Sequence, residues 1–199
     1  MASYPPAIER LLDELTRLPG VGPKTAERYL FALLRQPSAG LKAFGQAVAN
    51  LHETILNCQR CHNFDTQSPC RYCRDRQRDQ QVLCVVADAP DVLAIEQTGV
   101  YHGLYHVLGG TINTVEGQGP EQLHIADLLG RIPKEKITEV ILAMNPDIEG
   151  ETTSLYLKKA LAPSGVRLTQ LARGIPTGGD VTYLDEATLG EAITHRQPT

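Results

Sequence analysis

Four of the five cysteines stand in two Cys-x-x-Cys pairs, and this spacing constrains the fold more than any other feature of the chain. The pairs are Cys58/Cys61 and Cys70/Cys73, with eight residues between them. Each pair brings two thiolates to one point, so two pairs complete a tetrahedral site that suits zinc. Because such a site has no open position, we expect one structural Zn²⁺ per chain, stabilising residues 57–79, which have little apolar content. Two redox-active pairs or buried free thiols are the alternatives.

Residues 7–56 have the apolar periodicity of helices, with a first helix before Leu18 and two more over 23–35 and 38–56. Between the first two lies the segment Leu18–Ala26, of sequence LPGVGPKTA. Its prolines and glycines end one helix and suit the first turn of the next. The sequence therefore predicts a helical N-terminal module with a short hairpin.

That hairpin has the residues of a phosphate-binding turn. Gly20 and Gly22 allow a tight turn with outward N–H groups, and the next helix begins with unpaired N–H donors at the positive end of its dipole. Lys24 adds a charge, Thr25 a hydroxyl, and Arg28 a second cation for the expected DNA contact. The segment resembles the helix-hairpin-helix motif, which holds DNA backbones without reading sequence. A plain turn between helices, or a contact between subunits, is the alternative.

Five arginines crowd the cysteine insert: Arg60, Arg71, Arg74, Arg76 and Arg78. They favour either phosphate contact or a solvated surface around the metal site. A run of arginines is by itself only a weak nucleic-acid signal, so both interpretations stay open.

From residue 80 onward, short apolar runs alternate with helical patterns. The predicted strands cover 82–86, 105–108, 140–144 and 166–172, and the predicted helices 90–98, 122–129, 152–161 and 185–193. This alternation predicts a parallel sheet flanked by helices, an α/β module. Cys84 lies within the first apolar run, so we interpret it as a core residue and not as a ligand.

Carboxylates follow the third predicted strand, at the sheet edge where open α/β folds bind ligands. The segment Asn145–Glu151, of sequence NPDIEGE, carries Asp147, Glu149 and Glu151. It resembles the Toprim domain of topoisomerases, primases and related nucleases, in which an Asp-x-Asp pair and a lone Glu after the first strand hold Mg²⁺. An alternative is that the glutamates are helix N-terminal acids that complement the dipole.

Two positions depart from that Toprim pattern. Asn145 replaces the first aspartate of the pair, and Ala87 stands where the lone glutamate belongs, although Asp88 is adjacent. An amide carries no charge and an alanine binds no metal, so we do not expect Mg²⁺ as a cofactor or catalytic residues at this edge. We expect the edge to serve as a contact surface for a basic partner.

The charge is unevenly distributed along the chain. The net charge is −4, but residues 1–80 carry +3 (eleven basic minus eight acidic) and residues 81–199 carry −7 (eight minus fifteen). The net negative charge argues against indiscriminate nucleic-acid binding, whereas the split permits a basic N-terminal part that meets phosphates and an acidic part that meets another partner. No apolar run approaches the roughly 18 residues needed to span a bilayer, so we expect a soluble cytoplasmic protein without a membrane partner.

The order of modules resembles the RecR family of bacterial recombination mediators over nearly the whole chain. The expected modules are a helix-hairpin-helix domain at 1–56, a four-cysteine zinc knuckle at 57–79, a Toprim domain at 80–173 and a C-terminal segment at 174–199 involved in subunit contacts. The resemblance also rests on the segments Tyr105–Gly110, Lys136–Ala143 and Gly174–Gly179.

The resemblance implies a function without a chemical step. It implies a dimer-to-tetramer ring that clamps DNA and acts with RecO, and possibly RecF, to load RecA on gapped DNA coated by single-strand-binding protein. We expect Asp147, Glu149 and Glu151 to contact RecO. The alternatives are a Mg²⁺-dependent Toprim-type nuclease or primase-like phosphoryl transferase, and a regulatory zinc-and-DNA adaptor outside recombination.

Overall fold

The chain divides into two structural units, one ending at Thr54 and the other beginning at Ile55. The structure is a computed structural model that describes residues 4–196. In these residues, no helix is long and apolar enough to cross a membrane.

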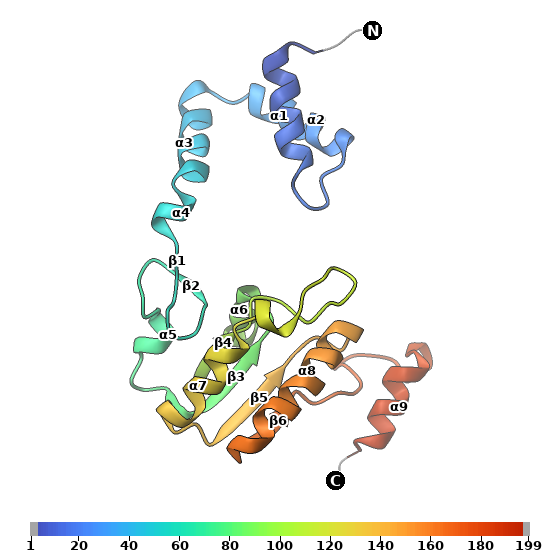
Figure 1. Ribbon diagram of the computed structural model, residues 1–199. Helices are drawn as coiled ribbons and strands as arrows, with labels where there is room; N and C mark the ends of the chain where they lie inside the picture. Colours follow the sequence, from blue (N-terminus) through green and yellow to red (C-terminus); the bar gives the residue numbers. More distant parts are fainter. Residues whose placement is uncertain (1–3, 197–199) are drawn as a thin grey trace. The chain divides into compact units, whose positions relative to one another are not determined.

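The first unit is helical, as predicted (Figure 1). Its helices are α1 (Pro6–Thr16), α2 (Pro23–Leu34), α3 (Ser38–Ala49) and α4 (Leu51–Thr54). Helices α1 and α2 pack together, and Ala26 and Leu30 of α2 are buried. No residue of α3 is buried, and Phe44 and Val48 on it are more than half exposed. This unit therefore presents a large apolar helix face to its surroundings.

The second unit is built on the predicted parallel sheet, which the structure confirms. Its strands are β3 (Asp79–Val86), β4 (Gly103–Val107), β5 (Glu139–Ala143) and β6 (Arg167–Gln170). Their order in the sheet is β4-β3-β5-β6, and every neighbouring pair is parallel. The central strand β3 is buried on both faces, because Leu83 and Val85 belong to one core cluster and Cys84 and Val86 to the other.

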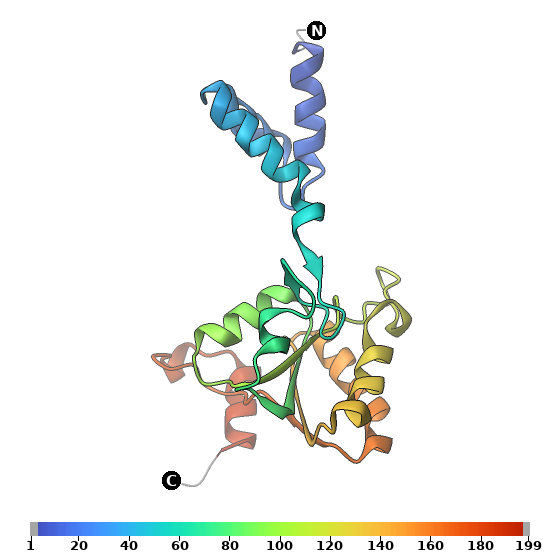
Figure 2. The same cartoon turned by 90° about the vertical axis from the view of Figure 1, so that its left-hand side faces the viewer.

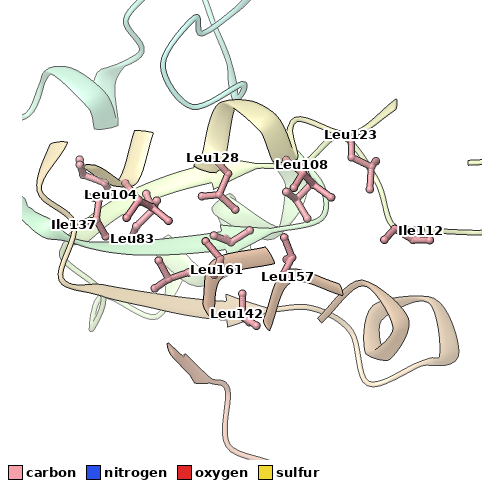
Figure 3. Packing of buried hydrophobic residues seen from close by; sticks show 14 residues of the cluster. Leu83, Leu104, Leu108, Ile112, Leu123, Leu128, Ile137, Leu142, Leu157 and Leu161 are labelled. Atoms are coloured by element: carbon pink, nitrogen blue, oxygen red, sulfur yellow. The ribbon is translucent and has the colours of Figure 1, made fainter. Parts of the chain in front are cut away.

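Helices α7 (Ile125–Glu135) and α8 (Ile148–Leu161) cover one face of this sheet, and helix α6 (Ala89–Gln97) and the cysteine knuckle cover the other. One core cluster joins β3 to α7 and α8, with Leu128 and Leu157 fully buried (Figure 3). The other cluster joins the sheet to α6 and to the four paired cysteines. Outside the knuckle, the unit also contains the 3₁₀ turns η1 (Pro120–Gln122), η2 (Ala162–Ser164) and η3 (Val181–Tyr183), and α9 (Glu186–Thr194).

Two helices of this unit differ from their predicted bounds. Helix α7 is predicted to end at residue 129 but runs to Glu135, because Arg131 and Ile132 are buried and extend its packed face. Pro133 lies in its last turn, and Lys136 caps it in a left-handed conformation. Helix α8 is predicted from 152 but begins at Ile148, because the Asp147 side chain caps it and accepts a hydrogen bond from Gly150 N at 2.7 Å. The acidic segment therefore lies within the first turn of α8.

The cysteine knuckle has little regular structure of its own. It contains the two-residue strands β1 (Leu56–Asn57) and β2 (Phe64–Asp65), which pair antiparallel, and the one-turn helix α5 (Arg71–Arg74). Figure 2 shows this segment beside the sheet. The backbone N–H of Val107 in β4 donates to the carbonyl of Cys61 at 2.8 Å, which ties the knuckle directly to the sheet.

Candidate functional site

The sulfur atoms of the four paired cysteines come together in the knuckle. Cys58, Cys61, Cys70 and Cys73 are all buried, and their sulfurs lie within 4.8 Å of one another. The sulfurs of Cys61 and Cys70 are 3.5 Å apart, and the backbone N–H of Cys70 donates to the sulfur of Cys58 at 3.2 Å. No disulfide joins them. The two Cys-x-x-Cys turns thus converge on one point, as the spacing predicts.

The chemistry of this group fits zinc. Hydrogen bonds from the other three thiols lower the pKa of Cys58 far below its ordinary value, whereas the same contacts together with burial raise the pKa of Cys61 and Cys73. A divalent cation at their centre would favour the thiolate form of all four. A tetrahedral arrangement of four such sulfurs leaves no position for a substrate, so the zinc would have a structural role. Cys84 lies apart from this group in β3, where burial raises the pKa of its thiol to about 12, and its burial confirms it as a core residue.

Arg60 anchors the knuckle to α7. Its guanidinium donates to both carboxylate oxygens of Glu135, at 2.8 and 3.0 Å, and to the carbonyl of Cys73 at 2.7 Å. The buried Arg131 donates to the same carboxylate at 2.9 Å. Burial alone would raise the pKa of Glu135, but the hydrogen bond from Arg60 and the charge of Arg131 outweigh it and lower that pKa.

Arg78 joins the end of the knuckle to α6. It forms two hydrogen bonds with Glu96, at 2.9 and 2.6 Å, and lies over the ring of Tyr72 at 4.8 Å. The hydroxyl of Tyr105 donates to the same glutamate at 2.6 Å. Burial opposes the charge on Glu96, but the bonds from Arg78 and Tyr105 outweigh it and lower its pKa.

Neither sequence interpretation of the arginines fits these two residues. Arg60 and Arg78 are engaged by carboxylates inside the protein, so they are neither free for phosphate nor simply solvated. Arg71, Arg74 and Arg76 are exposed, and both interpretations remain available for them.

The N-terminal hairpin forms as expected between α1 and α2. Gly20 has φ +76°, a left-handed conformation that glycine adopts without strain, whereas Gly22 is the N-cap of α2 in an extended conformation. Lys24 and Arg28 are exposed and lie one helical turn apart, so they share a face of α2. Thr25 is half-buried beside them. Among residues 4–196, no carboxylate forms an ion pair with either of these two cations.

The three predicted contact acids have different surroundings at the start of α8. Asp147 is exposed and its side chain is used as the helix cap. Glu151 pairs with Arg173, which follows β6. Glu149 is half-buried and makes no side-chain hydrogen bond or ion pair within the described part of the chain. Glu149 is thus the acid of this edge whose charge is least engaged.

The predicted first strand of the sheet, β3, is followed by Ala87 and Asp88, and neither contributes a free carboxylate beside the acids of α8. Ala87 is buried, and its carbonyl accepts hydrogen bonds from Gly109 N and Gly110 N, both at 3.0 Å. Asp88 is the N-cap of α6 and forms a capping box with Asp91. Over residues 4–196, two groups of three or more metal-ligating side chains come together, and neither contains an acid of this edge.

One of those groups is missed by sequence reasoning. His62, His124 and Asp127 bring their ligand atoms within 4.8 Å of one another. His62 belongs to the knuckle, whereas the other two belong to the start of α7. Residues so far apart in sequence give no local spacing signal, so only the docking of the knuckle on the sheet unit reveals the group.

Comparisons with known families match the whole order of modules. The chain matches the RecR helix-hairpin-helix model over residues 8–52 and the RecR zinc finger domain, which is defined by four cysteines, over 55–75. It matches the Toprim domain over 81–172 and the RecR C-terminal model over 174–197.

Curated relatives are similar to this chain over nearly its full length. The chain is 47% identical over 193 residues to the recombination protein RecR of Moorella thermoacetica, covering 97% of both chains. It is 46% identical to that of Cutibacterium acnes, covering 97% of this chain and 96% of the relative. It is 48% identical to that of Roseiflexus castenholzii, covering 97% and 94%.

Proposed function

The chain belongs to the RecR family of recombination proteins, and from this premise we propose that it is a DNA-binding mediator of recombinational repair. Its role is to hold DNA and a partner protein together, without a chemical step of its own. The observation that carries the proposal is the exposed pair of cations, Lys24 and Arg28, beside the glycine turn of a helix-hairpin-helix unit.

DNA contact in this proposal uses the backbone and not the bases. The backbone N–H groups of Gly22 and Lys24, the hydroxyl of Thr25 and the two cations all suit phosphate oxygens. A single such patch is weak. In a ring of two or four copies the patch is repeated around one duplex, and the effective concentration of each further contact makes the whole attachment strong.

The ring itself is the second part of the proposal. Helix α3 presents Phe44, Val48 and other apolar side chains that the first unit does not bury, and a second copy would cover them. The C-terminal segment from residue 174 contains no buried residue up to 196, which suits an element that exchanges between subunits. We infer a homo-oligomer, from dimer to tetramer, in the cytoplasm and associated with the nucleoid during repair.

The zinc site has a structural role in the proposal, with Cys58, Cys61, Cys70 and Cys73 holding one Zn²⁺ per chain. The convergence of four buried sulfurs supports it. Bound zinc stabilises a segment that has almost no regular structure of its own, and Arg60 and Arg78 then fix that segment to the sheet unit.

The acidic edge is the proposed docking surface for RecO. Glu149 has no partner among the described side chains, and Asp147 is exposed. Acids at such an edge attract a basic partner and raise its association rate. With RecO, and possibly RecF, the ring would load RecA on gapped DNA coated by single-strand-binding protein. Because Ala87 and Asn145 reduce the charge of the set, we do not assign Mg²⁺ or catalytic residues to it.

The DNA part is tested by the salt dependence of duplex binding. Lys24→Ala and Arg28→Ala should weaken binding at low salt and make the slope of log affinity against log salt less steep, by about 0.9 for each phosphate that the bound assembly no longer neutralises. Lys42→Ala, on α3, is the matched control and should change neither quantity. An unchanged affinity and slope in both hairpin variants would refute the assignment.

The partner part is tested separately. Glu149→Lys should abolish binding to immobilised RecO while DNA binding is retained. Lys159→Glu, at the opposite end of α8, serves as the charge-reversal control. RecO binding that persists in the Glu149 variant would overturn the docking assignment and leave the DNA assignment intact.

A further inference from the structure

The group made by His62, His124 and Asp127 lies where the cysteine knuckle meets α7. The Nε2 atom of His62 is 3.1 Å from a carboxylate oxygen of Asp127, and the Nδ1 atom of His124 is 3.8 Å from the same oxygen. The two imidazole rings lie 3.7 Å apart and nearly parallel. Three potential ligands from two segments distant in sequence therefore share one small volume.

The backbone at His62 is unusual for a residue with a side chain. Its φ is +63°, in the left-handed region that favours glycine, and it closes the Cys-x-x-Cys turn by donating its N–H to the carbonyl of Cys58 at 2.8 Å. A residue with a side chain is strained in this region, because its Cβ approaches the following carbonyl oxygen. Such strain is most often found at functional positions, where the side chain is needed.

The His62 side chain has an unmet hydrogen-bonding capacity in the folded protein. The Nε2 atom of His62 is buried and makes no hydrogen bond, because its contact with Asp127 lacks hydrogen-bond geometry. The buried ring of His106 contacts His62 edge-on, and its Nε2 atom lies 2.8 Å from the carbonyl of His124. His62 thus packs against two other histidine rings, with a buried ring nitrogen that has no hydrogen-bond partner.

We propose that His62, His124 and Asp127 form a second metal site, for a divalent transition ion such as Zn²⁺, Ni²⁺ or Co²⁺. Two imidazole nitrogens and a carboxylate oxygen are the donors that these ions prefer. The three ligand atoms lie within 4.8 Å of one another, close enough for one ion to contact all of them. The ion joins the knuckle to α7, in addition to the Arg60–Glu135 pair.

The proposed site is open to solvent, unlike the cysteine site. The Asp127 side chain is 63% exposed and lines a groove of about 560 Å³ together with Gln59, Arg60 and Lys134. Three protein ligands leave at least one coordination position free for water or for an anionic group of a bound molecule.

The test uses the full-length protein with one zinc per chain already present in the cysteine site. Co²⁺ is then added alone, and its visible absorption is followed. We expect one further Co²⁺ per chain, bound saturably, with weak ligand-field bands and without the strong thiolate-to-cobalt band of a cysteine site. Co²⁺ that binds only by replacing zinc, or does not bind, would overturn the proposal.

Variants identify the ligands. His62→Gly removes a ligand and also relieves the left-handed backbone, so it does not depend on a destabilised fold. We expect each of the three variants, His62→Gly, His124→Asn and Asp127→Asn, to bind Co²⁺ at least about tenfold more weakly. Removing a group that only hydrogen-bonds to a metal ligand already lowers metal affinity about 10- to 100-fold. The exposed His52, changed to Asn, is the control and should bind Co²⁺ as before. Unchanged affinity in all three ligand variants would refute the site.

Discussion

Replacing Glu135 by alanine removes the one carboxylate that pairs with both Arg60 and Arg131. Arg131 retains a hydrogen bond to the carbonyl of Tyr105, at 2.6 Å, but its charge is then uncompensated in a side chain only 5% exposed. Arg60 loses two of its hydrogen bonds and keeps the carbonyl of Cys73. The variant therefore leaves the buried cation of Arg131 without a carboxylate partner, at the point where the knuckle is fixed to α7.

The magnitude follows from this burial. Breaking a buried ion pair by removing one partner costs about 3–5 kcal/mol. Arg60 is 27% exposed, so water replaces part of its lost interaction and the lower end of the range applies. We expect Glu135→Ala to lower the free energy of unfolding of residues 55–199 by about 3 kcal/mol, which for a urea m-value of about 1–3 kcal/mol/M shifts the midpoint by about 1–3 M.

The assay is urea denaturation of the zinc-loaded protein, followed by tyrosine fluorescence and by zinc release to a chromogenic chelator. Glu151→Ala is the matched control in the same unit, because its pair with Arg173 is much more exposed and should contribute about 1 kcal/mol or less. If the two variants lose the same small amount of stability, the Glu135 network does not hold the knuckle.

Two further predictions concern the histidine core and the zinc. Burial lowers the pKa of His106 to about 3, whereas an unfolded histidine titrates near 6.5, so stability is complete above about pH 6.5 and falls as the pH drops toward 3. The titration of His106 alone should lower the free energy of unfolding by about 2 kcal/mol between about pH 6.5 and pH 5, measured from the urea midpoint at each of these two pH values. A His106→Gln variant that loses stability as steeply over this range would contradict the assignment. Cys70→Ser should reduce zinc from one equivalent to well below one by elemental analysis and expose the remaining paired thiols to a thiol reagent, whereas Cys84→Ala should keep its zinc; full zinc content in the serine variant would exclude Cys70 as a ligand.

Much of the fold is predictable because its signals are local. The two Cys-x-x-Cys pairs indicate convergence of four sulfurs, and the structure brings those sulfurs within 4.8 Å of one another. The apolar run at Val82–Val86 predicts a strand buried on both faces, which β3 is. These patterns depend only on neighbouring residues and on the period of a strand or a turn.

The parts that sequence reasoning misses depend on tertiary contacts. A proline normally ends a helix, but Pro133 lies in the last turn of α7, where Ile132 and Arg131 are buried and hold the turn in place. In the sequence, Arg60 and Arg78 look like surface cations, but in the folded protein they pair with Glu135 and Glu96. No local spacing in the sequence indicates these carboxylate partners.

If the protein holds DNA without altering it, the most direct measurement is incubation with labelled gapped DNA in excess Mg²⁺. The same sample is divided between a native and a denaturing gel. We expect retarded DNA on the native gel and strands of unchanged length on the denaturing gel. Shortened strands that disappear when a chelator is added would contradict this role, because Asp147 and Glu149 would then hold a catalytic metal.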